Sequence, residues 1–130
     1  LMKYEPVSVY GDGSQIRDYI FIDDLADAFL LAGVSSKAAG QVFNIGSGVG
    51  TKFIDMVDNL VRVVDRGKKI MVPWPKDYKD IETGDYVSDI SKARELLEWM
   101  PKVSMEEGVK KTFDFYTKHG KNYLWLYKYC

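Results

Sequence analysis

Hydrophobic residues recur with helical spacing in the middle of the chain, and this is the clearest pattern in the sequence. Between positions 53 and 64 apolar side chains fall at i, i+3, i+4, i+7, i+8 and i+11, on one face of a helix. They are Phe53, Met56, Val57, Leu60, Val61 and Val64. We interpret this stripe as ordinary core packing, with Thr51 as the expected N-cap.

Short runs of β-branched and aromatic residues predict four strands. They span residues 6–10, 18–22, 41–45 and 70–72. The Asp12-Gly13 turn closes the first, because glycine adopts positive φ at little cost. Pro73-Trp74-Pro75 ends the last, and a glycine-rich loop, residues 46–50, follows the third.

Three further helices are predicted from caps and spacing. Asp23 or Asp24 caps one and Asp89 caps a short second one. Ser104 and Glu107 form a capping box, in which the serine oxygen accepts a backbone N–H and Glu107 reaches back. Their inward positions are Leu25, Ala28, Phe29 and Ala32; Ile90, Ala93, Leu96 and Leu97; and Met105, Val109, Thr112, Phe113 and Tyr116.

This element order predicts the α/β class: a small mixed domain of about four helices and three to four short strands. The chain has 130 residues and is 46% hydrophobic, which suits one folded domain. We place the domain at residues 1–117 and treat 118–130 as an aromatic tail. Aromatic residues alternate there between positions 123 and 129, and the tail could pack on its own domain or on a neighbouring chain.

Charge and cysteine content narrow the function classes. Lys+Arg number 18 and Asp+Glu 19, scattered along the chain, so there is no electrostatic basis for binding nucleic acid or an anionic membrane. The single cysteine, Cys130, allows no internal disulfide, which suits a reducing compartment. No apolar run approaches the ~20 residues of a membrane span, and no signal peptide is evident. We expect a soluble, cytoplasmic protein.

The sequence offers little recognisable catalytic chemistry. Gly46-x-Gly48-x-Gly50 has the wrong spacing for a Gly-x-Gly-x-x-Gly dinucleotide loop, and no acidic residue ends the next strand. That loop could still contact an anion beside a helix N-terminus, or be a simple turn. His119, the only histidine, is expected to be exposed. No nucleophilic triad or metal-ligand spacing is present, so we predict no catalytic residue and no metal site.

Four segments in order resemble one family. The most specific is Gly-Asp-Gly-Ser-Gln-Ile-Arg-Asp-Tyr-Ile-Phe-Ile-Asp-Asp-Leu-Ala-Asp-Ala at 11–28. The others are Val-Phe-Asn-Ile-Gly-Ser-Gly at 42–48, Gly-Asp-Tyr-Val-Ser-Asp-Ile-Ser-Lys-Ala at 84–93, and Leu-Glu-Trp-Met-Pro at 97–101 with Ser-Met-Glu-Glu-Gly at 104–108. Together they resemble the C-terminal part of extended short-chain dehydrogenase/reductases, the NAD-dependent nucleotide-sugar epimerases and dehydratases. The resemblance covers nearly all of residues 5–117.

The resemblance implies a division of labour. In that family an N-terminal lobe holds NAD and a Tyr-x-x-x-Lys acid/base pair, and the C-terminal lobe binds the nucleoside diphosphate of the sugar. No tyrosine here has a lysine four residues on. We therefore expect a part that binds a UDP- or dTDP-type sugar nucleotide but is not catalytic alone, with NAD held by the N-terminal lobe.

The family pattern also implies site residues. Arg17 matches an arginine that contacts the diphosphate, although a structural pair with Asp18 or a loop carbonyl is the competing interpretation. Ser8 and Tyr10 match positions beside the nucleobase, where Tyr10 could equally be packed in a strand. Asp85 matches an acid near the ribose or diphosphate, or else it belongs to a plain turn.

Two departures from the family pattern stand out. Glu82 occupies a position where many relatives have a second diphosphate-binding arginine, and its carboxylate would repel phosphate. We expect Glu82 to point away, or Lys76 or Lys79 to supply the positive charge. Glu98 stands where glycine is usual, which we treat as a surface detail.

Association is the last expectation. The 42–45 strand would expose an unpaired edge, so we expect the isolated chain to form a homo-oligomer, most simply a dimer, or to bind an N-terminal lobe in trans. The alternative function is a stand-alone, non-enzymatic module or gene remnant that acts through such association. Met2 as a start codon behind Leu1 would fit that module, and a fragment of a longer enzyme would fit the resemblance.

Overall fold

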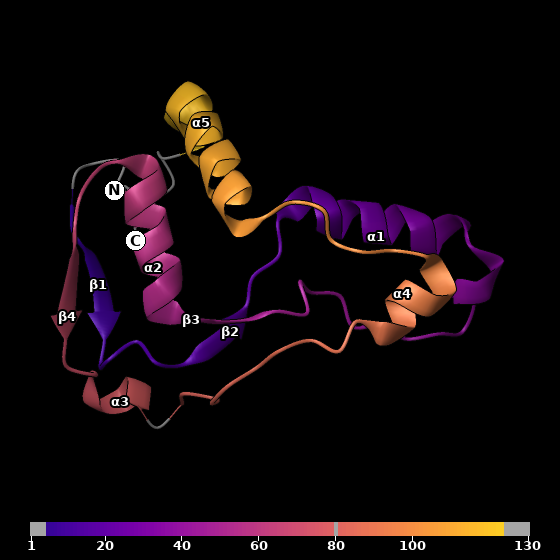
Figure 1. The fold of residues 1–130 in the computed structure, drawn as a ribbon, viewed down its shortest axis with the longest axis horizontal. Helices are drawn as coiled ribbons and strands as arrows, with labels where there is room; N and C mark the ends of the chain where they lie inside the picture. Colours follow the sequence, from indigo (N-terminus) through magenta and orange to yellow (C-terminus); the bar gives the residue numbers. More distant parts are fainter. Residues whose placement is uncertain (1–4, 80, 124–130) are drawn as a thin grey trace.

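The computed structural model describes residues 5–79 and 81–123 and confirms the α/β class. Within these residues, short strands and helices alternate along most of the chain (Figure 1). In order they are β1 (Val7–Tyr10), β2 (Ile16–Asp18), α1 (Ile22–Val34), a 3₁₀ helix (Ser36–Ala38), β3 (Gly50–Lys52), α2 (Phe53–Val64), β4 (Lys69–Val72), α3 (Lys76–Lys79), α4 (Ser91–Leu97) and α5 (Met105–Tyr123).

The strands form two small sheets. β1 pairs with β4 in parallel, with Val7 opposite Lys69 and Tyr10 opposite Val72. β2 pairs with β3 antiparallel, with Arg17 opposite Thr51. Parallel strands need a long crossover connection. The chain between β1 and β4 provides it, and α2 forms its last part, between β3 and β4.

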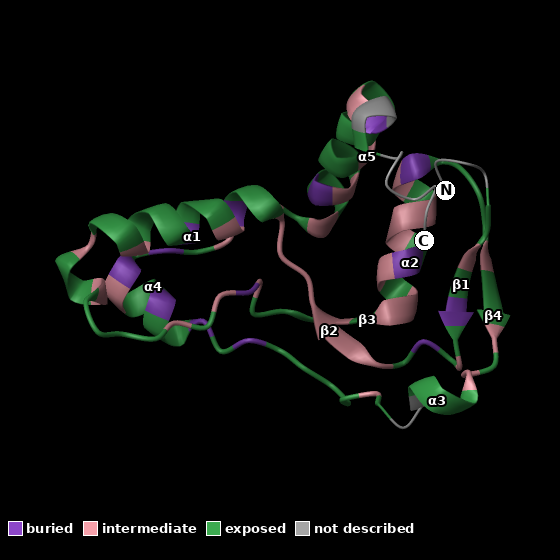
Figure 2. Cartoon of the chain, turned by 180° about the vertical axis from the view of Figure 1, so that it is seen from behind, coloured by how far each residue is buried: buried purple, intermediate pink, exposed green. Residues whose placement is uncertain are grey.

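The two ends of the molecule have separate apolar clusters. At one end, α1 packs on α4 around Ala28, Ala93 and Trp99, all at most 2% exposed (Figures 1 and 2). At the other, Val9 of β1 and Val57 of α2 are almost completely buried beside the β1–β4 pair. The β2–β3 pair lies between these ends. Splitting the core in this way leaves a large share of apolar surface uncovered.

The predicted strand at residues 41–45 is wrong. These residues form no strand, and β3 lies further on, at Gly50–Lys52. Phe43 and Ile45 pack against the α1–α4 cluster, whereas Val42 is 80% exposed. The β-branched and aromatic residues that suggested a strand are thus partly buried, but a strand needs a hydrogen-bonded neighbour, and none lies beside this segment among the described residues.

The predicted cap of α1 is also wrong. The helix begins at Ile22 with Phe21 as N-cap, so both aspartates lie in its first turn. Asp24 is buried instead and holds the segment after α4. Its backbone carbonyl accepts the Trp99 indole N–H at 3.1 Å, and its carboxylate accepts the Val103 backbone N–H at 2.9 Å.

Other predicted caps fare better. Asp89 accepts the Ser91 backbone N–H at 2.9 Å at the start of α4, although Ile90 is the formal N-cap. Ser104 Oγ accepts the Glu107 N–H at 3.2 Å, which confirms one half of the capping box. In place of the other half, the Glu107 carboxylate pairs with Lys111, 2.8 Å away. Thr51 is no cap, because it lies within β3 and Lys52 precedes α2.

Glu98 is more than a surface detail. It ends α4 in the left-handed conformation, with φ of 54°. In that region a side chain crowds the backbone, and glycine is the usual residue at such a helix end. The glycine expected from the family would therefore relieve strain at this turn.

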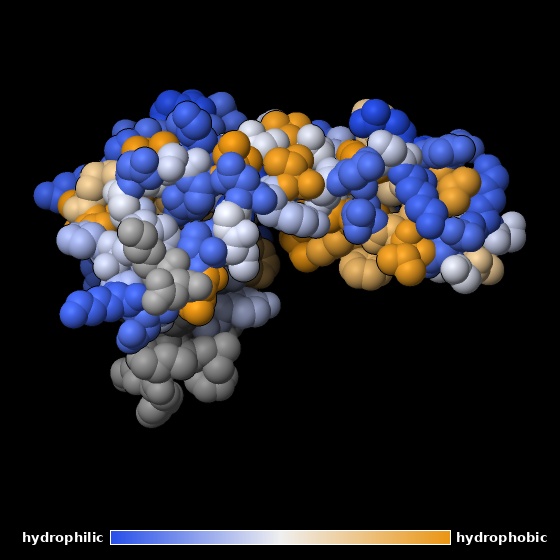
Figure 3. All heavy atoms as spheres, turned by 90° about the horizontal axis from the view of Figure 1, so that it is seen from below, coloured by the Kyte–Doolittle hydropathy of each residue, from blue (hydrophilic) through white to orange (hydrophobic). Residues whose placement is uncertain are grey.

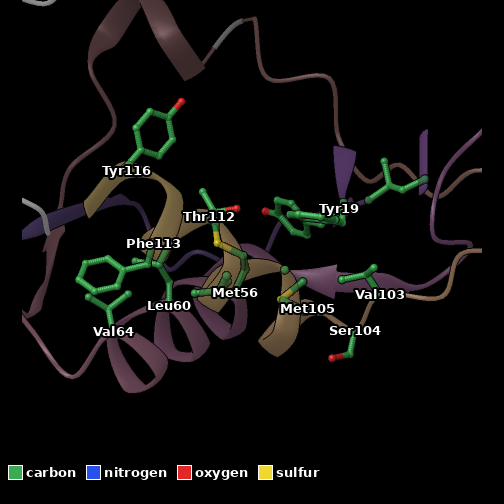
Figure 4. Close-up of a pocket in the computed structure, with 14 residues that line it drawn as sticks. Tyr19, Met56, Leu60, Val64, Val103, Ser104, Met105, Thr112, Phe113 and Tyr116 are labelled. Carbon is green, nitrogen blue, oxygen red and sulfur yellow. The ribbon is translucent and has the colours of Figure 1, made fainter. Parts of the chain in front are cut away.

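The apolar stripe of α2 packs against α5, as its spacing predicts, but the two helices do not fill the space between them. An apolar cavity of about 350 Å³ lies between these helices and residues 19–21. Figure 4 shows Met56 and Leu60 of α2 facing the same space as Thr112 and Phe113 of α5. The Tyr19 hydroxyl is buried here and has no hydrogen-bond partner among the described residues.

The outer face of α1 is strongly apolar. Phe29, predicted to face inward, is 71% exposed, and Leu30 and Val34 are 69% and 84% exposed. Figure 3 shows apolar surface, in orange, at this end of the molecule. No helix of the described chain is long and apolar enough to cross a lipid bilayer.

The C-terminal boundary stays a prediction. The α5 helix continues through residues 117 and 118 to Tyr123. His119, predicted to be exposed, is half-buried, with its ring 5.0 Å from that of Phe115. Tyr123 also contacts Phe115, and the rest of the aromatic tail lies outside the described residues.

Candidate functional site

Aromatic rings gather where β1 and β4 end. Because the two strands are parallel, Tyr10 and the segment after Val72 leave the sheet at the same edge. The Tyr10 ring lies 5.5 Å from that of Trp74 and 6.3 Å from that of Tyr78 on α3. Tyr10 and Tyr78 are 37% and 56% exposed. We call these three residues the aromatic cluster.

Glycine at position 11 allows the cluster to form. Gly11 has φ of 64°, and an added Cβ would lie 2.9 Å from Cδ1 of the Trp74 indole. Its N–H donates to the Val72 carbonyl at 2.9 Å, which holds the turn against β4. The sequence pointed to Tyr10 but missed Trp74 and Tyr78. The bracketing of Trp74 by two prolines was the one available signal, since it fixes a bulky ring at a strand end.

The turn after β1 leads directly to Arg17 on β2. The Arg17 side chain is 28% exposed, and its guanidinium donates to two carbonyls, that of Ile16 at 2.8 Å and that of Gly84 at 2.7 Å. It also donates to the carboxylate of Glu82. An arginine has five N–H groups, so two of them have no partner among the described residues. Arg17 thus has both structural partners and unused donors.

The expectation that Glu82 points away is wrong. Its side chain is 26% exposed, and its carboxylate forms an ion pair with Arg17. Opposite charges attract more strongly when they are partly shielded from water, which favours this inward position of the carboxylate. Lys76, one of the two lysines considered as a substitute charge, is exposed on α3. The side chain of the other, Lys79, lies outside the described residues.

Asp85 and Ser8 occupy different surroundings. Asp85 accepts the backbone N–H of Ile16 at 2.8 Å, and the Tyr86 N–H donates to the Ile16 carbonyl at 3.1 Å. Residues 84–86 therefore line the free edge of β2, next to Arg17. Ser8 is exposed on β1, two residues before Tyr10. The structure brings Arg17 and Asp85 together, and Ser8 shares a strand with Tyr10.

Asp18 joins three segments of the chain beside this site. Its carboxylate accepts the backbone N–H groups of Ser47 at 2.7 Å, Gly48 at 3.1 Å and Ser88 at 3.0 Å, and also the Ser47 hydroxyl. Burial raises the pKa of Asp18, but these hydrogen bonds outweigh it and leave the pKa below its ordinary value. Gly46 permits the approach, because an added Cβ would overlap the Asp18 carboxylate and lie 2.6 Å from Ser88 Cβ.

The same contacts exclude anion binding by the glycine-rich loop at residues 46–50. The N–H groups of Ser47 and Gly48 already point at the chain's own carboxylate. The N-terminus of α2 is also occupied, since the N–H groups of Phe53 and Ile54 donate to carbonyls of the turn before β2. Residues 46–50 therefore do not fit a dinucleotide phosphate, which needs free N–H groups and no adjacent carboxylate.

This arrangement is suited to binding rather than to proton transfer. A guanidinium with spare donors and exposed aromatic faces can hold a phosphate and a flat ring. Tyr19, the tyrosine nearest to Arg17 in sequence, stays protonated and so does not provide a phenolate base, because burial raises the pKa of its phenol.

Comparison with known proteins gives consistent matches. Residues 1–112 match the model of a family described as GDP-mannose 4,6 dehydratase. The UDP-glucose 4-epimerase of Mycolicibacterium smegmatis is 34% identical over 119 residues, which are 89% of this chain and 36% of that protein.

Solved structures agree. The UDP-glucose 4-epimerase of Thermotoga maritima, solved with UDP-glucose, superposes with a TM-score of 0.78 and 34% identity, over 90% of this chain and 36% of that one. The UDP-glucuronic acid 4-epimerase of Bacillus cereus, solved with UDP-glucuronic acid and NAD, gives 0.74 and 27%, over 90% and 37%. The chain therefore spans about a third of the length of these relatives.

Proposed function

We propose that this chain, which belongs to the GDP-mannose 4,6 dehydratase family of nucleotide-sugar epimerases and dehydratases, binds the nucleoside diphosphate of a sugar nucleotide. Arg17 contacts the diphosphate with its two unused N–H groups. The aromatic cluster receives the base, with Tyr10 as the central ring and Ser8 beside it. Asp85, whose carboxylate accepts the N–H of Ile16 next to Arg17, accepts a ribose hydroxyl.

The observation that carries the proposal is the short segment of chain that connects the aromatic cluster to Glu82, the ion-pair partner of Arg17. Tyr78 precedes Glu82, the ion-pair partner of Arg17, by four residues, which span at most ~14 Å even when fully extended. Charge-assisted donors and aromatic faces joined by so short a segment are what a nucleotide requires. Relatives solved with UDP-glucose and UDP-glucuronic acid support a uridine nucleotide as the first ligand to test.

Epimerisation or dehydration is proposed for a whole protein of the relatives' length. NAD would be held by a part of such a protein that lies outside this chain, since the glycine-rich loop at residues 46–50 does not fit a dinucleotide. In this proposal the chain's own residues bind and orient the nucleotide, and none of them transfers a proton. The chain by itself is then inactive.

Calorimetric titration tests the binding. UDP-, dTDP-, CDP- and GDP-sugars are titrated into the wild-type chain, Arg17→Ala and Arg62→Ala. Arg62 is a matched control, because it is also paired with a glutamate, Glu106, at 2.8 Å, but on α2. We expect Arg17→Ala to weaken binding about tenfold or more, as for loss of a charge-assisted contact, and Arg62→Ala to leave it unchanged. Equal affinity in all three proteins, or none in the wild type, contradicts the proposal.

Self-association is a second candidate function, favoured by the outer face of α1. Phe29, Leu30 and Val34 leave an apolar surface larger than scattered single residues would. We propose that in the isolated chain a second copy covers this face. Light scattering should give a mass above that of the monomer, and Val34→Asp should lower it. Ile81→Asp, at an equally apolar exposed position away from α1, is the control. A monomer at all concentrations removes this candidate.

A further inference from the structure

The ion pair between Arg17 and Glu82 places a carboxylate inside the proposed diphosphate site. Both side chains are only about one-quarter exposed. The guanidinium group that pairs with Glu82 belongs to the same arginine that would meet the phosphates. An incoming anion therefore approaches a pair with no net charge, rather than a free cation.

Glu82 is held there by the loop that carries it. The Gly84 carbonyl accepts from Arg17 at 2.7 Å, and Asp85 accepts the Ile16 N–H at 2.8 Å. Gly84 takes φ of 78°, which turns the chain back onto β2. With the loop fixed two and three residues downstream, the Glu82 carboxylate can shift around Arg17 but stays in its neighbourhood.

A fixed carboxylate opposes a ligand in proportion to the ligand's negative charge, because the Coulomb energy scales with the product of the charges. A neutral nucleoside is unaffected. A sugar nucleotide is opposed, and a free nucleoside diphosphate, which carries one more negative charge near neutral pH, is opposed more. The Glu82 carboxylate thus lowers the affinity more for ligands of higher negative charge, while Arg17 still donates hydrogen bonds to the phosphates.

We propose that Glu82 is a specificity-determining residue that favours the sugar ester of a nucleoside diphosphate over the free nucleoside diphosphate. This inference rests on the proposed function. The residue lowers affinity for every phosphorylated ligand, and it lowers affinity most for the most highly charged one. A site of this kind discriminates against a nucleotide that has lost its sugar.

The test measures dissociation constants of uridine, UDP-glucose and UDP for the wild-type chain and Glu82→Gln, at fixed pH and ionic strength. Glutamine keeps the size and hydrogen-bonding oxygen of the side chain and removes the charge. We expect no change for uridine, tightening of about fivefold for UDP-glucose and about tenfold for UDP, as graded repulsion at a partly screened site predicts. Glu106→Gln is the matched control, because its carboxylate pairs with Arg62 instead, and it should change none of the three.

The outcomes separate this inference from the proposed function. If UDP-glucose binds through Arg17 but Glu82→Gln leaves its affinity unchanged, the charge selection is wrong and the binding site stands. Weaker binding of all three ligands to Glu82→Gln indicates that Glu82 only orders the loop, and also overturns the inference. If no uridine compound binds either protein, the inference falls, and the titrations with dTDP-, CDP- and GDP-sugars decide whether the proposed function stands. Far-UV circular dichroism of Glu82→Gln confirms that the variant is folded.

Discussion

Ser88 donates its backbone N–H to the carboxylate of Asp18, 3.0 Å away, across 70 positions of the sequence. The same carboxylate accepts from Ser47 and Gly48, so three segments of the chain meet at one side chain. Asp18 directly follows Arg17, the proposed phosphate ligand. The junction therefore fixes the end of β2 from which the guanidinium extends.

Asp18→Asn should destabilise the fold. Asparagine keeps one acceptor oxygen but presents an NH₂ group to donors that need acceptors, and hydrogen bonds to a charged group each contribute about 1.5–3 kcal/mol. We expect a loss of about 3 kcal/mol in the free energy of unfolding, measured by urea denaturation. Asp89→Asn, which weakens a single exposed helix-start contact, should cost less. Equal losses in the two variants would show that the contacts of Asp18 stabilise the fold no more than the single contact of Asp89.

The free energy of unfolding should also depend on pH, because of the Asp18 carboxyl. The pKa of this carboxyl lies below its ordinary value of 3.8, because hydrogen bonds to Ser47, Ser88 and Gly48 outweigh the effect of burial. Its contribution is therefore complete above the unfolded-state pKa and is lost as the pH falls through the folded-state pKa. Unfolding free energies measured from pH 7 downward should show this loss below about pH 4. The asparagine variant should show a shallower decline, and parallel profiles would refute the assignment.

Gly46→Ala should be harmful and Gly33→Ala beneficial. A Cβ at position 46 would collide with Asp18 and Ser88, and overpacking of this kind costs about 1–3 kcal/mol. At position 33, within α1, a Cβ meets nothing within 4 Å, and alanine favours a helix by about 1 kcal/mol. Thermal unfolding of both variants should shift the midpoint in opposite directions. A higher midpoint for Gly46→Ala would contradict the geometry around Gly46, and a lower midpoint for Gly33→Ala would contradict the open space at position 33.

Glu98→Gly should stabilise the chain. Glu98 ends α4 at φ of 54°, where a side chain costs roughly 1 kcal/mol that glycine avoids. Asp65 ends α2 in the same conformation at φ of 51°, and Asp65→Gly should gain less, since aspartate tolerates the left-handed region better than glutamate. Differential scanning calorimetry would compare them. A lower midpoint for Glu98→Gly would mean that its side chain has a role that the backbone does not reveal.

The sequence predicted those parts of the fold that depend on local rules. The spacing of residues 53–64 is periodic enough to define α2 on its own, and the Ser104 cap and the 70–72 strand follow from local chemistry. The strand at 41–45 failed because a strand is defined by its neighbour, and periodicity shows only which side chains turn inward. Asp24 failed as a cap because its buried partners, Trp99 and Val103, lie 75 and 79 residues away.

In the candidate site too, the sequence predicted the residues in local motifs and missed those that depend on long-range folding. Arg17 and Tyr10 were named from a resemblance that spans contiguous segments, and the structure places them on β2 and at the end of β1, in two different sheets. The Glu82 pair and the contribution of Trp74 and Tyr78 depend on how residues 73–84 fold back onto β1 and β2. Nothing local in that polar segment specifies such a return.

The Asp18 junction has a consequence for the order of folding. Its contacts close loops of 29, 30 and 70 residues, so they carry a high entropic cost of closure and must form after local helices and turns. The transition state for folding should therefore lack them, and Asp18→Asn should accelerate unfolding while leaving the folding rate nearly unchanged. Arg17 and its neighbours would then reach their final geometry late, as the last segments of the chain come together.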